Sequence, residues 1–280
     1  MLLKIFAGIG ACGSVLQTAL SGGSGSALKT ALMLCLRFLE YFFGAHVAYA
    51  LLLYIGTELF VDLKKPQEKP SKFWIWQLRQ VADLMCFWAR VDIMTTGEEM
   101  IPTDTRYLMV SNHRSVADPV VTVKRFPHED LAFVSKPGNF RIPIVGKVMH
   151  KCGCLSLDRD DNRAALKTIQ QAVKYIDEDY TSVVIYPEGT RCHDDKTLPF
   201  HAGSFKIAQK AKVPVVCCCL RNTDKVAHNF PLKRTKIYID ILGVIDTEYV
   251  TSHKTRETAA LAEEMIQAKL DKEREIGSET

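Results

Sequence analysis

The stretch YLMVSNHRSVADP, residues 107–119, joins a β-prone run to a polar loop and a helix start. Residues 107–111 predict a buried strand because apolar and β-prone side chains dominate them. Asp118 and Pro119 predict a helix start, since Asp caps helix N-termini well and Pro suits the first helical position. Ligand sites of open α/β sheets gather where strands end. The stretch therefore predicts an α/β domain with a candidate site just after this strand.

Strand and helix candidates alternate from about residue 95 onward. The other expected strands are residues 131–135, 154–157, 182–186, 214–220 and 236–244. The expected helices are residues 119–125, 162–177, 203–211 and 255–275. This alternation predicts an α/β fold with a mixed, largely parallel sheet flanked by helices.

The first third of the chain is more apolar than the rest. Residues 1–31 contain no acid, and residues 5–20 within them resemble a signal-peptide core. We interpret residues 1–31 as an apolar N-terminal extension with a flexible joint at 22–26. Residues 38–61 approach the ~20 residues that cross a bilayer. Residues 73–91 carry tryptophans at helical spacing, as interfacial helices do. We expect residues 32–94 to form a two-helix membrane-associated element; the alternative is two core helices of a soluble domain.

Composition limits the classes of partner. The net charge of +4 suits an anionic membrane surface or substrate but is too weak to predict a nucleic-acid partner. Nine cysteines include no paired CxxC motif. Cys152, Cys154, Cys192 and His193 have the wrong spacing for a zinc site, so we expect reduced thiols and no metal.

His113 and Asp118 are the first candidates for chemistry. They lie five residues apart, and their side chains meet if the loop between them turns back. An imidazole held by a carboxylate is a general base that can activate an alcohol. The alternative is structural: Asp118 caps a helix, and His113 is an ordinary loop residue.

Two further stretches carry weaker signals. In VVIYPEGTR, residues 183–191, a buried strand runs into a turn whose glycine allows close backbone approach and whose Arg191 can bind a phosphate. Basic residues also follow other strands, at Lys136 and at Arg159. Each of these alone fits an ordinary turn with a solvated cation.

In combination and order these blocks resemble a known family. Asn-His-x-x-x-x-Asp (an HX4D motif), a basic block ending in Asp158-Arg159, Pro-Glu-Gly-Thr-Arg and Val-Pro-Val resemble the glycerolipid acyltransferases, which include lysophosphatidate acyltransferases (1-acylglycerol-3-phosphate O-acyltransferases). The resemblance spans about residues 95–245. It implies that His113 is the general base and Asp118 orients it. It also implies a substrate-binding set of Lys136, Arg159, Glu188, Gly189, Thr190 and Arg191, in which Arg191 grips the phosphate.

The resemblance further implies a reaction in phospholipid biosynthesis. A fatty acyl group would pass from acyl-CoA or acyl carrier protein to the hydroxyl of 1-acylglycerol 3-phosphate (lysophosphatidic acid), giving phosphatidic acid. It implies no cofactor beyond this co-substrate, and an acyltransferase domain at residues 95–280 on the cytoplasmic face of a membrane. Three alternatives stay open: another acceptor (a lysophospholipid, a lyso-ornithine lipid or glycerol 3-phosphate), a lipid or thioester hydrolase, and a non-catalytic lipid-binding module.

Overall fold

The chain forms two compact units in the computed structural model, which describes residues 1–21, 26–192, 194 and 196–278. The units are Met1–Lys65 and Pro66–Thr280. This division differs from the expected boundaries near residues 32 and 94, because the second expected membrane helix belongs to the unit that contains the sheet. Most of the expected joint at 22–26, and His193, lie outside the described residues. The membrane association of residues 32–94 as one element stays a prediction.

The first unit is a pair of helices, α1 (Leu2–Leu20) and α2 (Ala27–Phe60). They approach closely where Gly10 meets Phe38 and Gly13 meets the ring of Tyr41, since a Cβ at either glycine would touch the facing side chain. Arg37 of α2 donates to the hydroxyl of Thr18 at 2.9 Å. Both helices are long and apolar enough to associate with a membrane.

The second unit is built on a seven-stranded sheet. Its strands are β1 (Val91–Thr96), β2 (Leu108–Ser111), β3 (Leu131–Ser135), β4 (Leu155–Ser156), β5 (Ser182–Ile185), β6 (Val215–Arg221) and β7 (Thr235–Ile245). Their order is β1-β7-β6-β2-β5-β3-β4, and every neighbouring pair is parallel except β6 and β7. The mixed, largely parallel sheet predicted from the sequence is confirmed.

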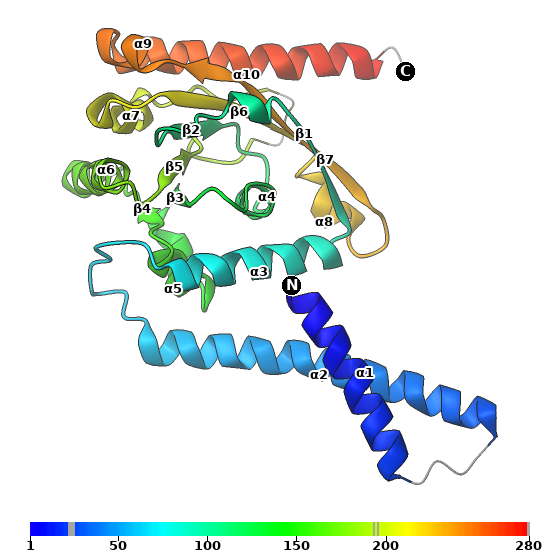
Figure 1. The fold of residues 1–280 in the computed structure, drawn as a ribbon. Helices are drawn as coiled ribbons and strands as arrows, with labels where there is room; N and C mark the ends of the chain where they lie inside the picture. The colour runs from blue at the N-terminus through cyan, green and yellow to red at the C-terminus, as the bar shows by residue number, and fades with distance from the viewer. Residues whose placement is uncertain (22–25, 193, 195, 279–280) are drawn as a thin grey trace. The chain divides into compact units, whose positions relative to one another are not determined.

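Helices cover both faces of this sheet (Figure 1). They are α3 (Lys72–Trp88), α4 (Asp118–Arg125), α5 (Val145–Lys151), α6 (Asn162–Asp177), α7 (Lys206–Ala211), α8 (Lys225–Asn229), α9 (Thr247–Ser252) and α10 (Thr255–Ser278). Figure 1 shows α6, α7 and α10 along one side of the strands, and α3 and α4 along the other. Because both faces are covered, the central strands are apolar at successive positions rather than alternately.

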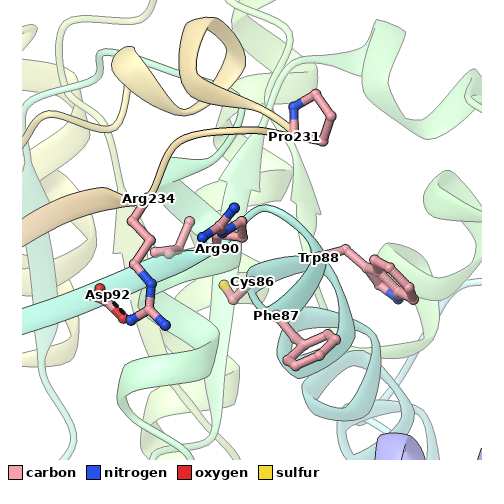
Figure 2. A pocket seen from close by; sticks show the side chains of 8 residues that line it. Cys86, Phe87, Trp88, Arg90, Asp92, Pro231 and Arg234 are labelled. Atoms are coloured by element: carbon pink, nitrogen blue, oxygen red, sulfur yellow. Dashed lines mark hydrogen bonds and ion pairs between the residues drawn. The ribbon is translucent and has the colours of Figure 1, made fainter.

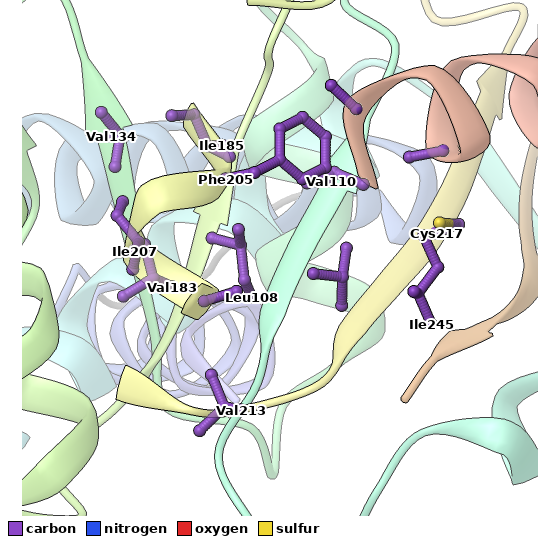
Figure 3. Packing of buried hydrophobic residues seen from close by; sticks show 14 of the residues in the cluster. Leu108, Val110, Val134, Val183, Ile185, Phe205, Ile207, Val213, Cys217 and Ile245 are labelled. Carbon is purple, nitrogen blue, oxygen red and sulfur yellow. The ribbon is translucent and has the colours of Figure 1, made fainter. Parts of the chain in front are cut away.

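The main hydrophobic core lies between the sheet and the α6, α7 and α10 side. Figure 3 shows Leu108 and Val110 of β2 packed beside Ile185 of β5 and Phe205. Cys217 of β6 belongs to the same cluster, and burial raises the pKa of its thiol to about 12. All nine cysteines, each within the described ranges, are free. The three cysteines of β6, Cys217 among them, are buried, so these thiols are packing residues rather than nucleophiles.

The topology brings two motifs together. β2 lies between β5 and β6, so its carboxyl end is adjacent to theirs. The His113 loop follows β2, and the Pro-Glu-Gly-Thr-Arg turn follows β5. The two stretches, 75 residues apart in sequence, therefore meet at one edge of the sheet.

Candidate active site

His113 and Asp118 are in direct contact. The loop after β2 turns back so that Nδ1 of His113 lies 2.7 Å from Oδ2 of Asp118. The Asp118 side chain is completely buried, whereas 21% of the His113 side chain is exposed. The carboxylate thus holds Nδ1, and Nε2 is the ring nitrogen left for a substrate.

Asp118 is itself fixed by the loop that it closes. Its Oδ2 accepts hydrogen bonds from the backbone N–H groups of Arg114 at 2.7 Å and Ser115 at 2.9 Å. Asp118 also begins α4, which places it in the positive field of a helix N-terminus. The same carboxylate therefore both closes the loop and orients the imidazole.

Glu188 clamps the backbone of His113 from the neighbouring strand. Its Oε1 accepts from the N–H of His113 at 2.9 Å, and its Oε2 accepts from the N–H of Leu198 at 3.2 Å. On the other side, the N–H of Cys192 donates to the carbonyl of His113 at 2.8 Å. The resemblance assigned Glu188 to acceptor binding, but both of its oxygens already serve backbone groups. In this structure Glu188 fixes the position of the His113 loop, and its contact with the acceptor stays a prediction.

The imidazole plane is also supported. The ring of Tyr186, the residue after β5, stacks on His113 with centroids 4.4 Å apart and an interplanar angle of 15°. Burial raises the pKa of the Tyr186 hydroxyl well above its ordinary value, so the ring stays neutral. In the sequence Tyr186 is only the last residue of an expected strand, and nothing local indicates that its ring stacks on His113.

Asn112 ties the same loop to β6. Its amide donates to the carbonyl of Leu220 at 2.9 Å and accepts from the N–H of Leu220 at 2.8 Å. The side chain thereby continues the β2–β6 ladder one step beyond Ser111. Arg114 extends the anchoring, since its Nε lies 3.1 Å from Asp224. His113 is therefore flanked by two buried residues that bind the neighbouring strand and the loop beyond it.

Replacing Glu188 with Gln should lower kcat roughly 10- to 100-fold, because an amide has one acceptor oxygen for two N–H groups and the His113 loop will shift.

Burial raises the pKa of Glu188 above its ordinary 4.5. The folded state thus binds this proton more tightly than the unfolded state. The contribution of Glu188 to stability should fall as pH rises from 4.5 to the raised pKa. Melting temperatures measured at pH 4–7 test this. The fall of melting temperature with pH should be smaller in Glu188→Gln than in the unmodified protein, and unchanged in the exposed control Glu264→Gln. Equal pH dependence in all three proteins would contradict the role of Glu188.

Gly189 and Arg159 come together at the turn after β5. Gly189 has a φ of +75°, and a Cβ there would collide with the guanidinium of Arg159. Partial burial lowers the pKa of Arg159. The absence of a side chain at Gly189 therefore permits both the positive φ and the close approach of the Arg159 guanidinium to this turn.

Gly189→Ala should cost roughly 1–2 kcal/mol of stability, because a side chain is disfavoured at positive φ. It should also raise KM for the acceptor by displacing Arg159. Gly203→Ala is the matched control, since nothing lies within 4 Å of a Cβ there. Thermal unfolding and acceptor titrations measure both effects. Adding Arg159→Ala to Gly189→Ala should recover part of the stability; strict additivity would disprove the collision.

The other predicted binding residues are less tightly grouped. Thr190 and Arg191 are exposed on the turn that follows β5, and Lys136 is exposed after β3. Since β3 neighbours β5, Lys136 leaves the sheet at the same edge as the turn. The structure thus gathers His113, Asp118, Glu188 and Gly189 with Arg159, and leaves three polar side chains on the adjoining surface. A base flanked by cationic side chains can deprotonate a hydroxyl on a phosphate-bearing molecule.

Comparison with known proteins gives one family repeatedly. A family model described as Acyltransferase matches residues 92–221. A 1-acyl-sn-glycerol-3-phosphate acyltransferase of Salmonella typhimurium is 30% identical over 170 residues, covering 59% of this chain and 69% of the relative. The enzyme of that name from Saccharomyces cerevisiae is 29% identical over 67% of this chain and 61% of its own length.

Two further matches extend this result. A chloroplastic enzyme of the same name from Brassica napus is 37% identical over 46% of this chain, and the match spans 37% of its own length. The chain therefore matches less than two thirds of the yeast and Brassica proteins. The crystal structure of the 1-acyl-sn-glycerophosphate acyltransferase PlsC from Thermotoga maritima has a TM-score of 0.59 at 23% identity. The match covers 81% of this chain and 88% of the Thermotoga maritima chain, and it supports the same fold.

Proposed function

We propose that this chain, which belongs to the glycerolipid acyltransferase family, transfers a fatty acyl group from an acyl thioester to the free hydroxyl of 1-acylglycerol 3-phosphate. The product is phosphatidic acid. The observation that carries the proposal is the 2.7 Å contact between Nδ1 of His113 and the buried carboxylate of Asp118. It fixes the tautomer whose Nε2 can accept a proton.

The transfer needs one base and no covalent enzyme intermediate. Nε2 of His113 takes the proton of the acceptor hydroxyl as the oxygen attacks the thioester carbonyl. The tetrahedral intermediate collapses, the carbon–sulfur bond breaks, and the imidazolium returns the proton to the leaving thiolate. Asp118 stabilises the transient imidazolium. The donor is acyl-CoA or acyl carrier protein, and the step requires no metal or redox cofactor.

The acceptor phosphate is assigned to the cationic side of the site. Arg159 lies against Gly189, Arg191 belongs to the same turn, and Lys136 leaves the neighbouring strand. Guanidinium groups bind phosphate through paired N–H donors. This arrangement favours a phosphate-bearing acceptor, with another lysophospholipid or glycerol 3-phosphate as the alternative acceptors.

We place the second unit on the cytoplasmic face of a membrane. Lys64, Lys65 and Lys69 follow α2, and basic residues beside apolar helices favour the cytoplasmic side. The lysophosphatidic acid substrate resides in the same bilayer. The partners are thus the bilayer, lysophosphatidic acid and the thioester donor.

The deciding experiment is thiol release from palmitoyl-CoA by the purified full chain in detergent, with and without lysophosphatidic acid. We expect release that depends on the acceptor, with labelled phosphatidic acid as the product. Equal release without acceptor would replace the transferase with a hydrolase. Release that requires glycerol 3-phosphate or another lysolipid instead would change the acceptor. His113→Ala protein reports the background of the assay.

A further inference from the structure

A surface cavity opens in the second unit where α3 ends and β1 begins. It has a volume of about 460 Å³. Its lining includes Phe87 and Trp88 of α3, Arg90 between the two elements, and Pro231 and Arg234 of the segment that leads into β7. Figure 2 shows these side chains around one opening, with Arg90 between Trp88 and Arg234.

Large apolar side chains stand in solvent around this cavity. Leu232 is 81% exposed and Phe230 is 55% exposed, in the short segment between α8 and β7. Phe87 and Trp88 add exposed aromatic surface from the end of α3. We call residues 87–90 and 230–234 the interfacial surface. Exposed apolar groups of this size, gathered beside cations, mark contact sites rather than ordinary solvated surface.

The segment that leads into β7 carries only positive charge. Residues 225–236 contain Lys225, Lys233, Arg234 and Lys236 and no acid. Across the cavity, Asp92 lies 3.4 Å from Arg234, an exposed pair that offsets one of these charges. Arg90 donates to the carbonyl of Leu232 at 2.7 Å, so it fixes the segment with one of its five N–H groups. The interfacial surface therefore combines exposed apolar side chains with basic ones.

Topology sets this surface beside the catalytic edge. β7 is antiparallel to β6, and β1 is parallel to β7. The starts of β1 and β7 therefore lie at the edge where β2, β5 and β6 end. That is the edge from which the His113 loop and the Glu188 turn emerge. Whatever binds the interfacial surface will also face the side of the sheet that carries His113.

We propose that the interfacial surface docks on the headgroup region of an anionic phospholipid bilayer. Phe230, Leu232 and Trp88 enter the boundary between headgroups and acyl chains, while Lys233 and Arg234 contact lipid phosphates. Amphipathic surfaces of this kind bind through buried apolar area and attraction to anionic lipids. The contact gives the second unit its own attachment, separate from α1 and α2, and turns the catalytic edge toward the lipid.

A fluorescent label at one position can distinguish lipid contact by the interfacial surface from lipid contact by α1 and α2. Cys12 and Cys35 are the exposed thiols and the other seven cysteines are buried. In a Cys12→Ser, Cys35→Ser background, Leu232→Cys or the control Thr251→Cys carries one fluorophore. Thr251 is exposed on α9, which follows β7 at the opposite edge of the sheet. The full chain is then mixed with phosphatidylglycerol vesicles that contain a lipid nitroxide near the top of the acyl chain.

We expect strong quenching of the label at 232 and little at 251. Lys233→Glu with Arg234→Glu should cut the quenching at 232 roughly fivefold or more, because each basic residue adds attraction to an anionic surface. The matched pair Lys254→Glu with Arg256→Glu should leave it unchanged. Phosphatidylcholine vesicles should give weaker quenching than phosphatidylglycerol.

Several outcomes would overturn the proposal. Equal quenching at 232 and 251 would mean that the surface does not face lipid, and protection of the label without quenching would assign it to a protein partner or a second copy. If neither pair of charge-reversing substitutions changed the quenching at 232, Lys233 and Arg234 would have no role in the contact. No substrate is present, so none of these results depends on whether the chain transfers acyl groups.

Discussion

His113→Ala should lower kcat for acyl transfer by about 10³-fold, within the range that a positioned general base contributes. KM for both substrates should change little, because the imidazole acts on the proton rather than on binding. The loop should remain folded, since Glu188 and Cys192 hold the backbone of residue 113 and not its side chain. Steady-state kinetics with palmitoyl-CoA and lysophosphatidic acid measure the loss.

The variant Asp118→Asn tests whether the carboxylate acts together with His113. The amide keeps the size of the carboxylate but removes the charge that stabilises the imidazolium and selects the tautomer. Its kcat should fall nearly as far as that of His113→Ala, and the double variant should be no worse than either one. Independent, multiplying losses would show that the two residues do not act as a pair.

Asn112→Ala should destabilise the second unit by about 2–6 kcal/mol, because it leaves two buried backbone groups of Leu220 without a partner at roughly 1–3 kcal/mol each. The melting temperature should fall by roughly 5–15 °C for a unit of this size. A thiol-reactive dye can follow unfolding in detergent, since seven cysteines are buried in the native protein.

Asn229→Ala is the control for Asn112→Ala. Its amide makes one hydrogen bond, to the hydroxyl of Thr235, and it is only partly buried. Its loss should cost about 1 kcal/mol or less. Asn112→Asp should fall between the two, because the carboxylate can accept from the N–H of Leu220 but repels its carbonyl. Equal melting temperatures for the two Ala variants would remove the role assigned to the Asn112 bridge.

Most central strands were predictable from the sequence, whereas β1 was not. The central strands are short apolar runs bounded by turn residues, and both signals are local. Only two residues separate the end of the apolar helix α3 from the start of β1, so the apolar periodicity continues across the boundary. The break is made by Arg90, whose φ of +52° ends the helix, and no sequence rule marks an arginine for that conformation.

The candidate site divides in the same way. The pairing of His113 with Asp118 was foreseeable because the four loop residues between them can turn back and bring the two side chains together. The clamp by Glu188 was not, because it depends on β5 lying beside β2 although β3 and β4 separate them in sequence. Tyr186 and Asn112 act through the same neighbouring strands. Their residue types alone carried no signal of stacking on, or anchoring, the His113 loop.

The pairing of β1 with β7 also sets an order for biosynthesis. Thr96 and Asp240 are hydrogen-bonded although 144 residues separate them. At roughly 5–20 residues per second, a ribosome needs on the order of ten seconds to make that intervening chain. During this interval β1 has no partner strand, while α1 and α2 have already left the ribosome. The two apolar helices of the first unit are therefore complete well before the sheet of the second unit gains its last edge strand.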